Sequence, residues 1–145
     1  MTEPGSRYPF GGEIIITERL WRFYIRDVAK LVARVMRAAG CTADVVLTDD
    51  LTVQRLNRRD RRRNKPTNVL TYEQPPEILL AFGVVRFEAM AAQKPLAAHL
   101  AHLLVHGALH LQGFDHQHAG QARRMEGQET KLLARLGVPN PWKNR

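Results

Sequence analysis

Cysteine is almost absent from this chain of 145 residues, because Cys41 is the only one. A single thiol excludes an internal disulfide, and this composition suits a reducing compartment. No other cysteine lies near Cys41 along the chain, so we predict a structural role for its side chain.

Long apolar runs are also missing. No stretch approaches the roughly 20 apolar residues that a membrane-spanning helix requires, and residues 1–12 are polar, with glycine and proline, and lack the apolar segment of a secretion signal. These absences predict a soluble cytoplasmic protein with no membrane partner. We expect residues 1–12 to form a flexible N-terminal arm.

Acidic residues are outnumbered by basic ones. The chain has 14 Asp and Glu against 22 Lys and Arg, which leaves a net charge of +8. Such an excess favours a polyanionic partner, either a nucleic acid or an anionic membrane surface. A hydrophobic content of 44% in 145 residues fits one globular domain with a real core.

The positive charge is concentrated between residues 55 and 65, where Asp60 is the only acid. Such a run is often only a solvated loop, but the overall net charge favours contact with phosphate groups. No aromatic side chain interleaves the run, so we expect no base stacking from it. The candidate nucleic-acid-binding side chains are Arg55, Arg58, Arg59, Arg62, Arg63 and Lys65, together with Arg61.

The pattern of apolar residues predicts strands mixed with helices. Short apolar or β-branched runs predict strands at 14–17, 45–47, 69–72 and 78–81. Helical spacing predicts helices at 20–39, 84–92, 96–111 and 119–136, and a short helix around Val53 and Leu56. There is no regular βαβ rhythm, so we predict an α+β fold with a small mixed sheet packed against helices. The expected single domain covers residues 13–139, followed by a tail at 140–145.

The stretch from residue 106 to 116 has the spacing of a metal site. His106 and His110 are four residues apart on the predicted helix, so they project from one face, one turn apart. Gly113 can reverse the chain beyond the helix end and bring His116 back towards them. Three imidazoles with an open fourth position form the ligand set of a catalytic zinc site. We therefore predict one zinc ion on a helix that is followed by a glycine turn.

The other histidines fit this site less well. His102 is also four residues from His106, but it lies eight residues, or about 12 Å along a helix, from His110. That separation is too long for one ion with Zn–N bonds of about 2.0–2.1 Å. We interpret His99, His102 and His118 as surface residues or as residues that support the ligands.

The same pattern, H-x-x-x-H-x-x-G-x-x-H, matches the spacing of metzincin proteases. Those proteases carry a glutamate directly after the first histidine, where it acts as the general base. Here that position is Gly107, which has no side chain to accept a proton. A metalloprotease is therefore the less favoured hypothesis.

Two motifs resemble the YbeY family of bacterial endoribonucleases and ribosomal-RNA maturation factors. Residues 106–116 have every fixed position of that family's H-G-x-L-H-L-x-G-[YF]-D-H segment. Residues 56–70 resemble its L-N-x-x-[YF]-R-x-x-D-x-P-T-[DN]-V-L segment, in which Arg61 matches the functional arginine. Together with Met125, Glu126 and Glu129 in the last helix, the resemblance covers roughly residues 45–136. Departures from the family pattern occur at Asp60, at Asn64, at Pro76-Glu77 and in a shortened loop between Tyr72 and Glu77.

The resemblance implies a zincin-like α+β fold with zinc on His106, His110 and His116. It also implies single-strand-specific cleavage of RNA during maturation of the 3′ end of small-subunit ribosomal RNA, and a role in ribosome quality control. The partners that it suggests are single-stranded ribosomal RNA, proteins of the small ribosomal subunit and an Era-type GTPase.

Arg61 and Asp115 are the candidate catalytic residues. We expect Arg61 to stabilise the negative charge of a pentacoordinate phosphorane. Asp115 is the only acid within the zinc motif, and it fits either a general base or a hydrogen-bonding partner of a ligand histidine. The nucleophile is either water or the 2′-hydroxyl of the RNA. If His102 or Asp115 were a fourth ligand, the zinc would be structural and the protein a non-catalytic, RNA-binding assembly factor.

Overall fold

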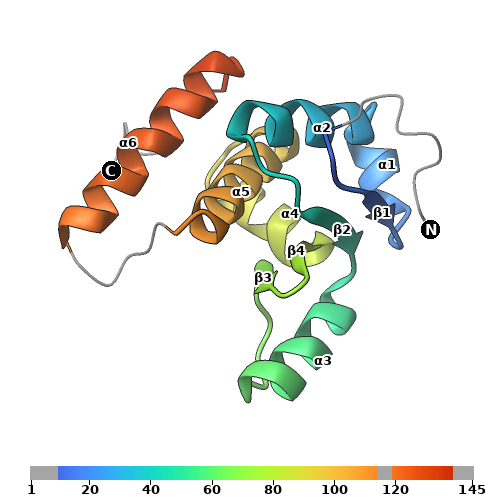
Figure 1. The fold of residues 1–145 in the computed structure, drawn as a ribbon. Coiled ribbons are helices and arrows are strands. Elements are labelled where there is room, and N and C mark those ends of the chain that lie inside the picture. Colours follow the sequence, from blue (N-terminus) through green and yellow to red (C-terminus); the bar gives the residue numbers. More distant parts are fainter. Residues whose placement is uncertain (1–9, 114–118, 139–145) are drawn as a thin grey trace.

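The structure is a computed structural model that describes residues 10–113 and 119–138. Within these residues the chain forms one small sheet and a set of helices around it (Figure 1). The elements in chain order are β1 (Ile14–Ile16), α1 (Leu20–Tyr24), α2 (Val28–Ala39), β2 (Asp44–Thr48), α3 (Asp50–Arg61), β3 (Val69–Glu73), β4 (Pro76–Ala81), α4 (Phe82–Ala91), α5 (Leu96–Leu111) and α6 (Ala119–Arg135).

The sheet is mixed, as the sequence predicts. Its strand order is β1-β2-β4-β3; β1, β2 and β4 run parallel, and β3 pairs antiparallel with β4 at the edge. The antiparallel pair is a hairpin in which Glu73 lies opposite Pro76. The prediction of an α+β domain with a small mixed sheet is therefore confirmed.

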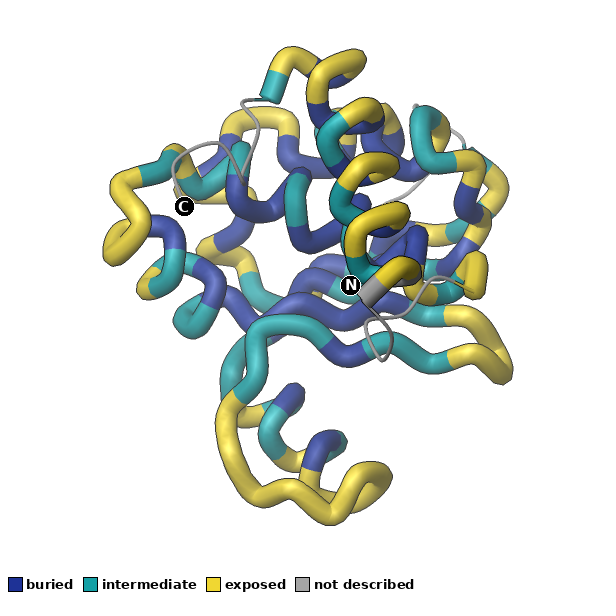
Figure 2. The backbone as a smooth tube through the Cα atoms, turned by 90° about the vertical axis from the view of Figure 1, so that its left-hand side faces the viewer, coloured by how far each residue is buried: buried dark blue, intermediate teal, exposed yellow. Residues whose placement is uncertain are grey.

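Both faces of the sheet are covered because alternate side chains of a strand point to opposite faces. Val45, Leu47, Ile78 and Leu80 join the main core, which α2, α5 and α6 complete. On the other face, Leu79 and Leu70 meet Val53 of α3 in a smaller core. Figure 2 shows the buried sheet strands between the helical layer and the more exposed α3 region below.

The stretch predicted as one helix at 20–39 is two helices in the structure, so that prediction was wrong in one respect. The break lies at residues 25–27, where Asp27 has a left-handed backbone with φ of 51°. The turn places the Trp21 side chain in the core, where its indole Nε1 donates to the Thr48 carbonyl at 3.0 Å. Tertiary packing of this ring outweighs the helical periodicity of the sequence.

The helix around Val53 and Leu56 is longer than the sequence predicts. Asp49 caps its start by accepting a hydrogen bond from the Thr52 N–H at 2.7 Å. Arginine, leucine and glutamine are good helix formers, so the helix continues through Arg61 and ends at Arg62, which has φ of 55°. Residues 55–61 of the basic run are therefore helical, and only residues 62–65 form a loop.

The predicted terminal segments lie largely outside the described residues, which exclude 1–9 and 139–145. Within the range predicted as an arm, Phe10 packs against the main core. No helix in the described part of the chain is long and apolar enough to cross a membrane.

Candidate functional site

Helix α5 presents a column of histidines: His99, His102, His106 and His110 follow one another at spacings of three or four residues. These spacings place the four rings along one side of the helix. His99 is buried, the His106 side chain is 30% exposed, and His110 is exposed, so the column runs from the interior to the surface.

The predicted ligands His106 and His110 lie at the exposed end of this column. Gly113 follows the helix with φ of 100°, a left-handed conformation that favours glycine and turns the chain as the motif predicts. The third predicted ligand, His116, and the candidate catalytic Asp115 lie outside the described residues. The structure therefore places two of the three predicted zinc ligands.

Glu129 of α6 faces this column from the neighbouring helix. Its carboxyl group is fully buried, and its Oε2 lies 2.8 Å from Nδ1 of His106 and 3.6 Å from Nε2 of His102. Burial alone would raise the pKa of this carboxyl. The His102 and His106 rings outweigh that effect and hold the pKa at about 2, so Glu129 is an anion at neutral pH.

His99 belongs to a separate polar group further inside. Its Nε2 lies 2.9 Å from Oε1 of Glu88 on α4, and the Asn68 side-chain amide donates to the same oxygen at 3.0 Å. Burial lowers the pKa of His99, although Glu88 acts in the opposite direction. The interpretation of His99 as a surface residue is therefore wrong: it links α5 to α4 and to the residue that precedes β3.

Gly107 explains how α5 approaches the sheet. A Cβ at this position would lie 3.2 Å from Cγ2 of Ile78 and 3.4 Å from Cγ2 of Thr71. The helix therefore touches β4 and β3 at the residue that replaces the protease glutamate. Position 107 faces the sheet, whereas His102 and His106 face Glu129 of α6.

Arg61 lies at the edge of the sheet beside this contact. Its Nη2 donates to the carbonyl oxygen of Thr71, and its guanidinium carbon lies 5.5 Å from the centre of the Tyr72 ring. Thr71 is also the β3 residue that contacts α5 at Gly107. Thr71 thus connects Arg61 to α5, the helix that carries His106 and His110.

A hollow of about 360 Å³ opens beside Arg61. Asn57 shapes it, because its buried side-chain amide donates to the Lys65 carbonyl at 3.1 Å and holds the basic loop against α3. Three cationic side chains line the hollow, so its walls suit an anionic group. The lining residues are Asn57, Arg61, Arg63, Lys65, Thr67, Val69 and Leu70.

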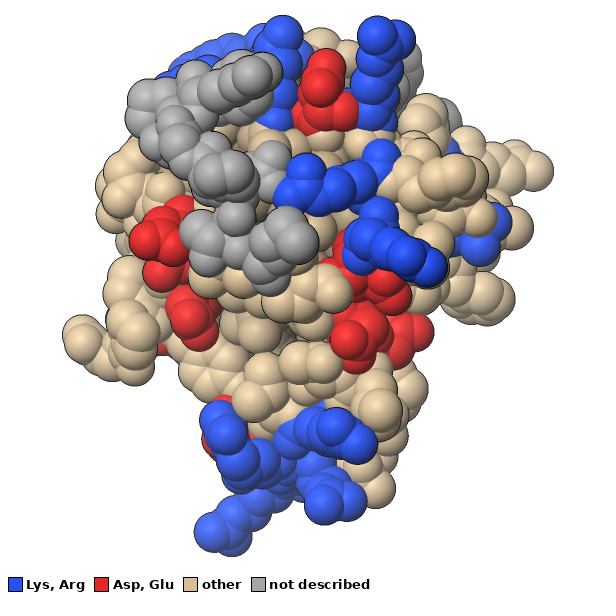
Figure 3. Space-filling view, turned by 90° about the vertical axis from the view of Figure 1, so that its right-hand side faces the viewer, with Lys and Arg blue, Asp and Glu red and all other residues tan. Residues whose placement is uncertain are grey.

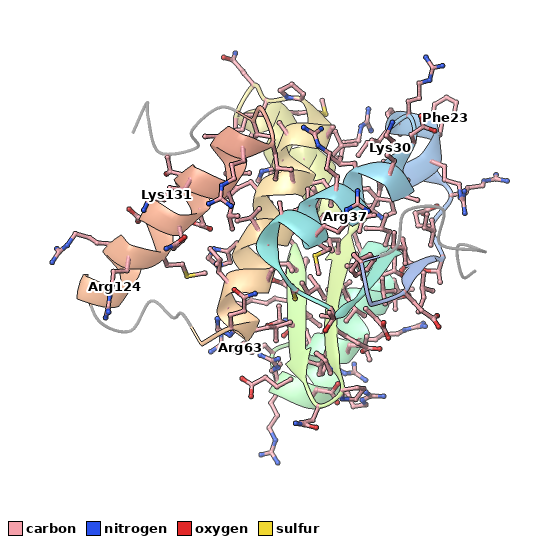
Figure 4. The ribbon with its side chains drawn as sticks, turned by 45° about the horizontal axis from the view of Figure 1, so that its top comes forward. Phe23, Lys30, Arg37, Arg63, Arg124 and Lys131 are labelled. Carbon is pink, nitrogen blue, oxygen red and sulfur yellow. The ribbon has the colours of Figure 1, made fainter. Side chains whose placement is uncertain are left out.

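The basic side chains of this region are exposed to solvent. Figure 3 shows Lys and Arg side chains gathered at the lower end of the molecule, where Figure 1 places α3. Figure 4 shows Arg63 near the lower end of the molecule, whereas Arg124 and Lys131 of α6 point outward from another side. The predicted RNA-binding residues Arg55, Arg58, Arg59, Arg62, Arg63 and Lys65 thus share one surface region with Arg61.

Asp60, a departure from the family pattern, binds two of its neighbours. Its carboxylate accepts from Nε and Nη2 of Arg59 at 2.6 and 2.9 Å, and from the Tyr72 hydroxyl at 2.6 Å. The hydrogen bonds from Arg59 and then Tyr72 lower the pKa of Asp60 to about 2. Burial, followed by the bond to Asp60, raises the pKa of Tyr72 to about 12. Arg59 is therefore already paired, while Asp60 joins the end of α3 to β3.

The contact between Glu129 and the α5 histidines was not predicted from the sequence. A usable signal was present, because the predicted apolar side of the last helix includes Met125, Leu132, Leu133 and Leu136, and residue 129 falls among them. A charged residue at a core position of a helix requires a polar partner from elsewhere. The sequence does not say which partner it is.

Comparisons with known proteins agree with the resemblance in the two motifs. The family model described as Endoribonuclease YbeY matches residues 12–137. An Endoribonuclease YbeY from Gluconobacter oxydans (strain 621H) is 44% identical over 97% of this chain and 92% of its own length. One from Bradyrhizobium sp. is 38% identical over 92% of each chain, and one from Halorhodospira halophila is 45% identical over 73% of this chain and 77% of its own.

A solved structure supports the fold. The solution structure of TM1509 from Thermotoga maritima superposes with a TM-score of 0.55 at 20% sequence identity, covering 90% of this chain and 99% of that one. At this identity the likeness concerns the fold alone. Because the family model spans nearly all of the sheet and helices described above, and the relatives match most of the chain, this protein belongs to the YbeY family.

Proposed function

We propose that this protein is a zinc-dependent, single-strand-specific endoribonuclease with a zincin-like site. Its proposed roles are maturation of the 3′ end of small-subunit ribosomal RNA and ribosome quality control in the cytoplasm. The observation that carries the proposal is the juxtaposition of two elements: the exposed His106–His110 end of α5, and the basic hollow beside Arg61, joined through Thr71. The relatives' shared name, Endoribonuclease YbeY, supports the same activity.

The chemistry of the two described histidines suits a zinc ion. Nδ1 of His106 faces the Glu129 carboxylate, so a metal would be bound through Nε2. His110 follows one turn later at the surface, and imidazole nitrogen is a usual zinc donor. We propose His116 as the third ligand. A bound zinc would supply a Lewis acid for the scissile phosphodiester.

Arg61 would bind and stabilise the phosphate. The Thr71 carbonyl uses one of its nitrogens and the Tyr72 ring supports its plane, so the remaining N–H groups can fork onto phosphate oxygens. Held in this way, the guanidinium is already oriented when negative charge increases during cleavage. Arg63 and Lys65 in the same hollow, and the other basic residues around it, would hold the flanking backbone.

The proposed partners follow from the same family resemblance. They are single-stranded ribosomal RNA, proteins of the small ribosomal subunit and an Era-type GTPase. If cleavage required one of these proteins, free RNA would be bound through the basic region but not cut, which is also the behaviour of a non-catalytic assembly factor.

The first prediction concerns removal of the metal. A single-stranded ribosomal-RNA fragment should be cut by the zinc-loaded protein, should survive after chelation, and should be cut again when zinc is restored. A fully duplex RNA of the same sequence should survive throughout. Gel separation of end-labelled RNA measures all of these. Cleavage by the purified protein that persists in chelator would contradict zinc dependence, and the absence of cleavage in every sample would contradict an endoribonuclease that acts on free RNA.

The chemical groups at the ends of the cleaved RNA distinguish the two possible nucleophiles. Attack by the neighbouring 2′-hydroxyl leaves a 2′,3′-cyclic phosphate, whereas attack by water leaves a simple phosphate and a hydroxyl. Only the second route needs a protein base for a water molecule, which is the role considered for Asp115.

A second prediction concerns Arg61. Arg61→Ala should lower the cleavage rate by roughly 10²–10³-fold, because it removes an oriented donor to the developing charge. Arg55→Ala, on the exposed side of the same helix, should cost only a few-fold because it removes one diffuse backbone contact. Single-turnover rates at constant salt measure both. Equal losses in the two variants would mean that Arg61 contributes only to the general positive potential.

A further inference from the structure

The Glu129 carboxylate is the most deeply buried charge in the described part of the chain. It is 0% exposed because it sits on α6 among Met125, Leu132 and Leu133 of the main core. An ionised carboxylate is kept in such a place only when strong partners compensate for its lost hydration. Its partners are two histidines of α5, one of them a predicted zinc ligand.

The contact with His106 has the geometry of a support for a metal ligand. Glu129 Oε2 lies 2.8 Å from Nδ1 of the His106 ring. An ionised carboxylate can only accept, so Nδ1 is the donor in this contact and a metal would bind through Nε2. Ligand histidines commonly donate their second nitrogen to a carboxylate in this way, which fixes the tautomer and increases the basicity of the ligand. We propose that Glu129 is a positioning residue for the zinc site, acting through His106; this inference rests on the proposed function.

The packing of α6 holds this carboxylate in one place. Apolar neighbours on α6 are buried one turn before and one turn after it, and α6 lies directly along α5. His102 Nε2 lies 3.6 Å from the same Oε2 and adds a second favourable interaction. The carboxylate is therefore held away from solvent and directed at His106.

A second pair of a histidine on α5 and a carboxylate on a neighbouring helix offers a matched control. Glu88 is a carboxylate that meets another α5 histidine, His99, at 2.9 Å, and its second partner is Asn68. His99 lies two turns of helix before His106 and is buried, so we assign that pair a purely structural role. Replacing each glutamate by glutamine makes the same chemical change at a His–carboxylate pair, once beside a proposed ligand and once away from it.

The experiment measures the zinc affinity of the metal-free full-length protein by competition with a chromophoric chelator. Glu129→Gln should weaken zinc binding by roughly 10–100-fold, the range found when such outer partners of metal ligands are removed. Glu129→Met, which has no acceptor for the His106 N–H, should weaken it more. Glu88→Gln should bind zinc within about twofold of the parent, even where its melting temperature falls.

A second measurement uses the unaltered protein, so it stands even if a Glu129 variant does not fold. In ¹⁵N-labelled protein, the His106 ring, assigned with a His106→Gln variant, should carry its proton on Nδ1 before zinc is added. Added zinc should then shift the Nε2 resonance and leave Nδ1 protonated. Zinc on Nδ1 would overturn the proposal.

The outcomes separate this inference from the function on which it rests. A folded Glu129→Gln variant that binds zinc like the parent would overturn the positioning role and leave the proposed zinc enzyme intact. An equal loss in Glu88→Gln would also overturn it, because the effect would then reflect general loosening of α5. A parent that binds no zinc would overturn the proposed function and this inference together.

Discussion

Replacing His110 with alanine is expected to abolish zinc binding and RNA cleavage while leaving the fold intact. His110 is exposed in the last turn of α5, so its removal opens no cavity in the core. Alanine is the best helix former, and this helix position should tolerate it at a cost below about 0.5 kcal/mol. The variant should therefore separate chemistry from stability.

The loss of activity should be large because the variant removes a proposed ligand of the metal, not a partner of a ligand. Outer partners cost roughly 10–100-fold, so the loss of one of three ligands should exceed that range and reach about 10³-fold or more. Zinc affinity by chelator competition and single-turnover RNA cleavage should fall together. The melting temperature of the metal-free variant should stay close to that of the metal-free parent.

Gln128→Ala provides the control preparation. Gln128 is exposed on α6, and its replacement should change neither zinc affinity nor cleavage. If the His110→Ala sample cut RNA as fast as the Gln128→Ala sample, the cleavage would come from a contaminant or from a site elsewhere. If both bound zinc equally, His110 would not be a ligand.

Helix α5 was predicted well because the sequence signals for its start, its end and its histidine spacing are local. The histidine spacing, the proline before α5 and the glycine after it all act within a few residues, and the structure has the helix at Leu96–Leu111 with Gly113 at positive φ. Asp49 at the start of α3 and Gly40 at the end of α2 are helix caps whose signals are equally local.

Other features were not predictable because their causes are distant in sequence. The break after α1 depends on Trp21 reaching the Thr48 carbonyl 27 residues later. The Glu129–His106 contact joins residues 23 apart on two helices whose packing no local pattern describes. The extent of α3 was underestimated for a different reason, because a run of arginines looks like a loop although arginine is a good helix former.

Replacing Gly107 with glutamate restores the sequence signature of a metalloprotease, yet we expect it to destabilise the protein strongly and not to create a protease. Position 107 lies where α5 crosses the sheet, and even a Cβ there would come within 3.2 Å of Ile78 and 3.4 Å of Thr71. A glutamate would be forced into this contact with no described group placed to neutralise it. Overpacking and a buried unpaired charge together should cost about 4–6 kcal/mol.

Gly107→Ala shows how much of that cost is steric. Alanine should gain about 1 kcal/mol of helix propensity and lose about 1–3 kcal/mol through overpacking against Ile78, which has to move by a few tenths of an ångström. We expect a folded protein with a free energy of unfolding lowered by about 1 kcal/mol. Urea unfolding followed by circular dichroism measures both variants.

Comparing the two Gly107 variants also tests whether this fold can support a metalloprotease. A general base must lie within hydrogen-bonding reach of the proton that it accepts, and position 107 points at β3 and β4 while His106 faces Glu129 of α6. A Gly107→Glu protein that folded with the parent's stability and cleaved a fluorogenic peptide would show that this geometry is wrong. Peptide cleavage at background, with the free energy of unfolding reduced as expected, would mean that the glycine serves the close packing of helix on sheet. The same packing brings β3 next to α5, and Arg61 lies beside this contact because it donates to Thr71 of β3.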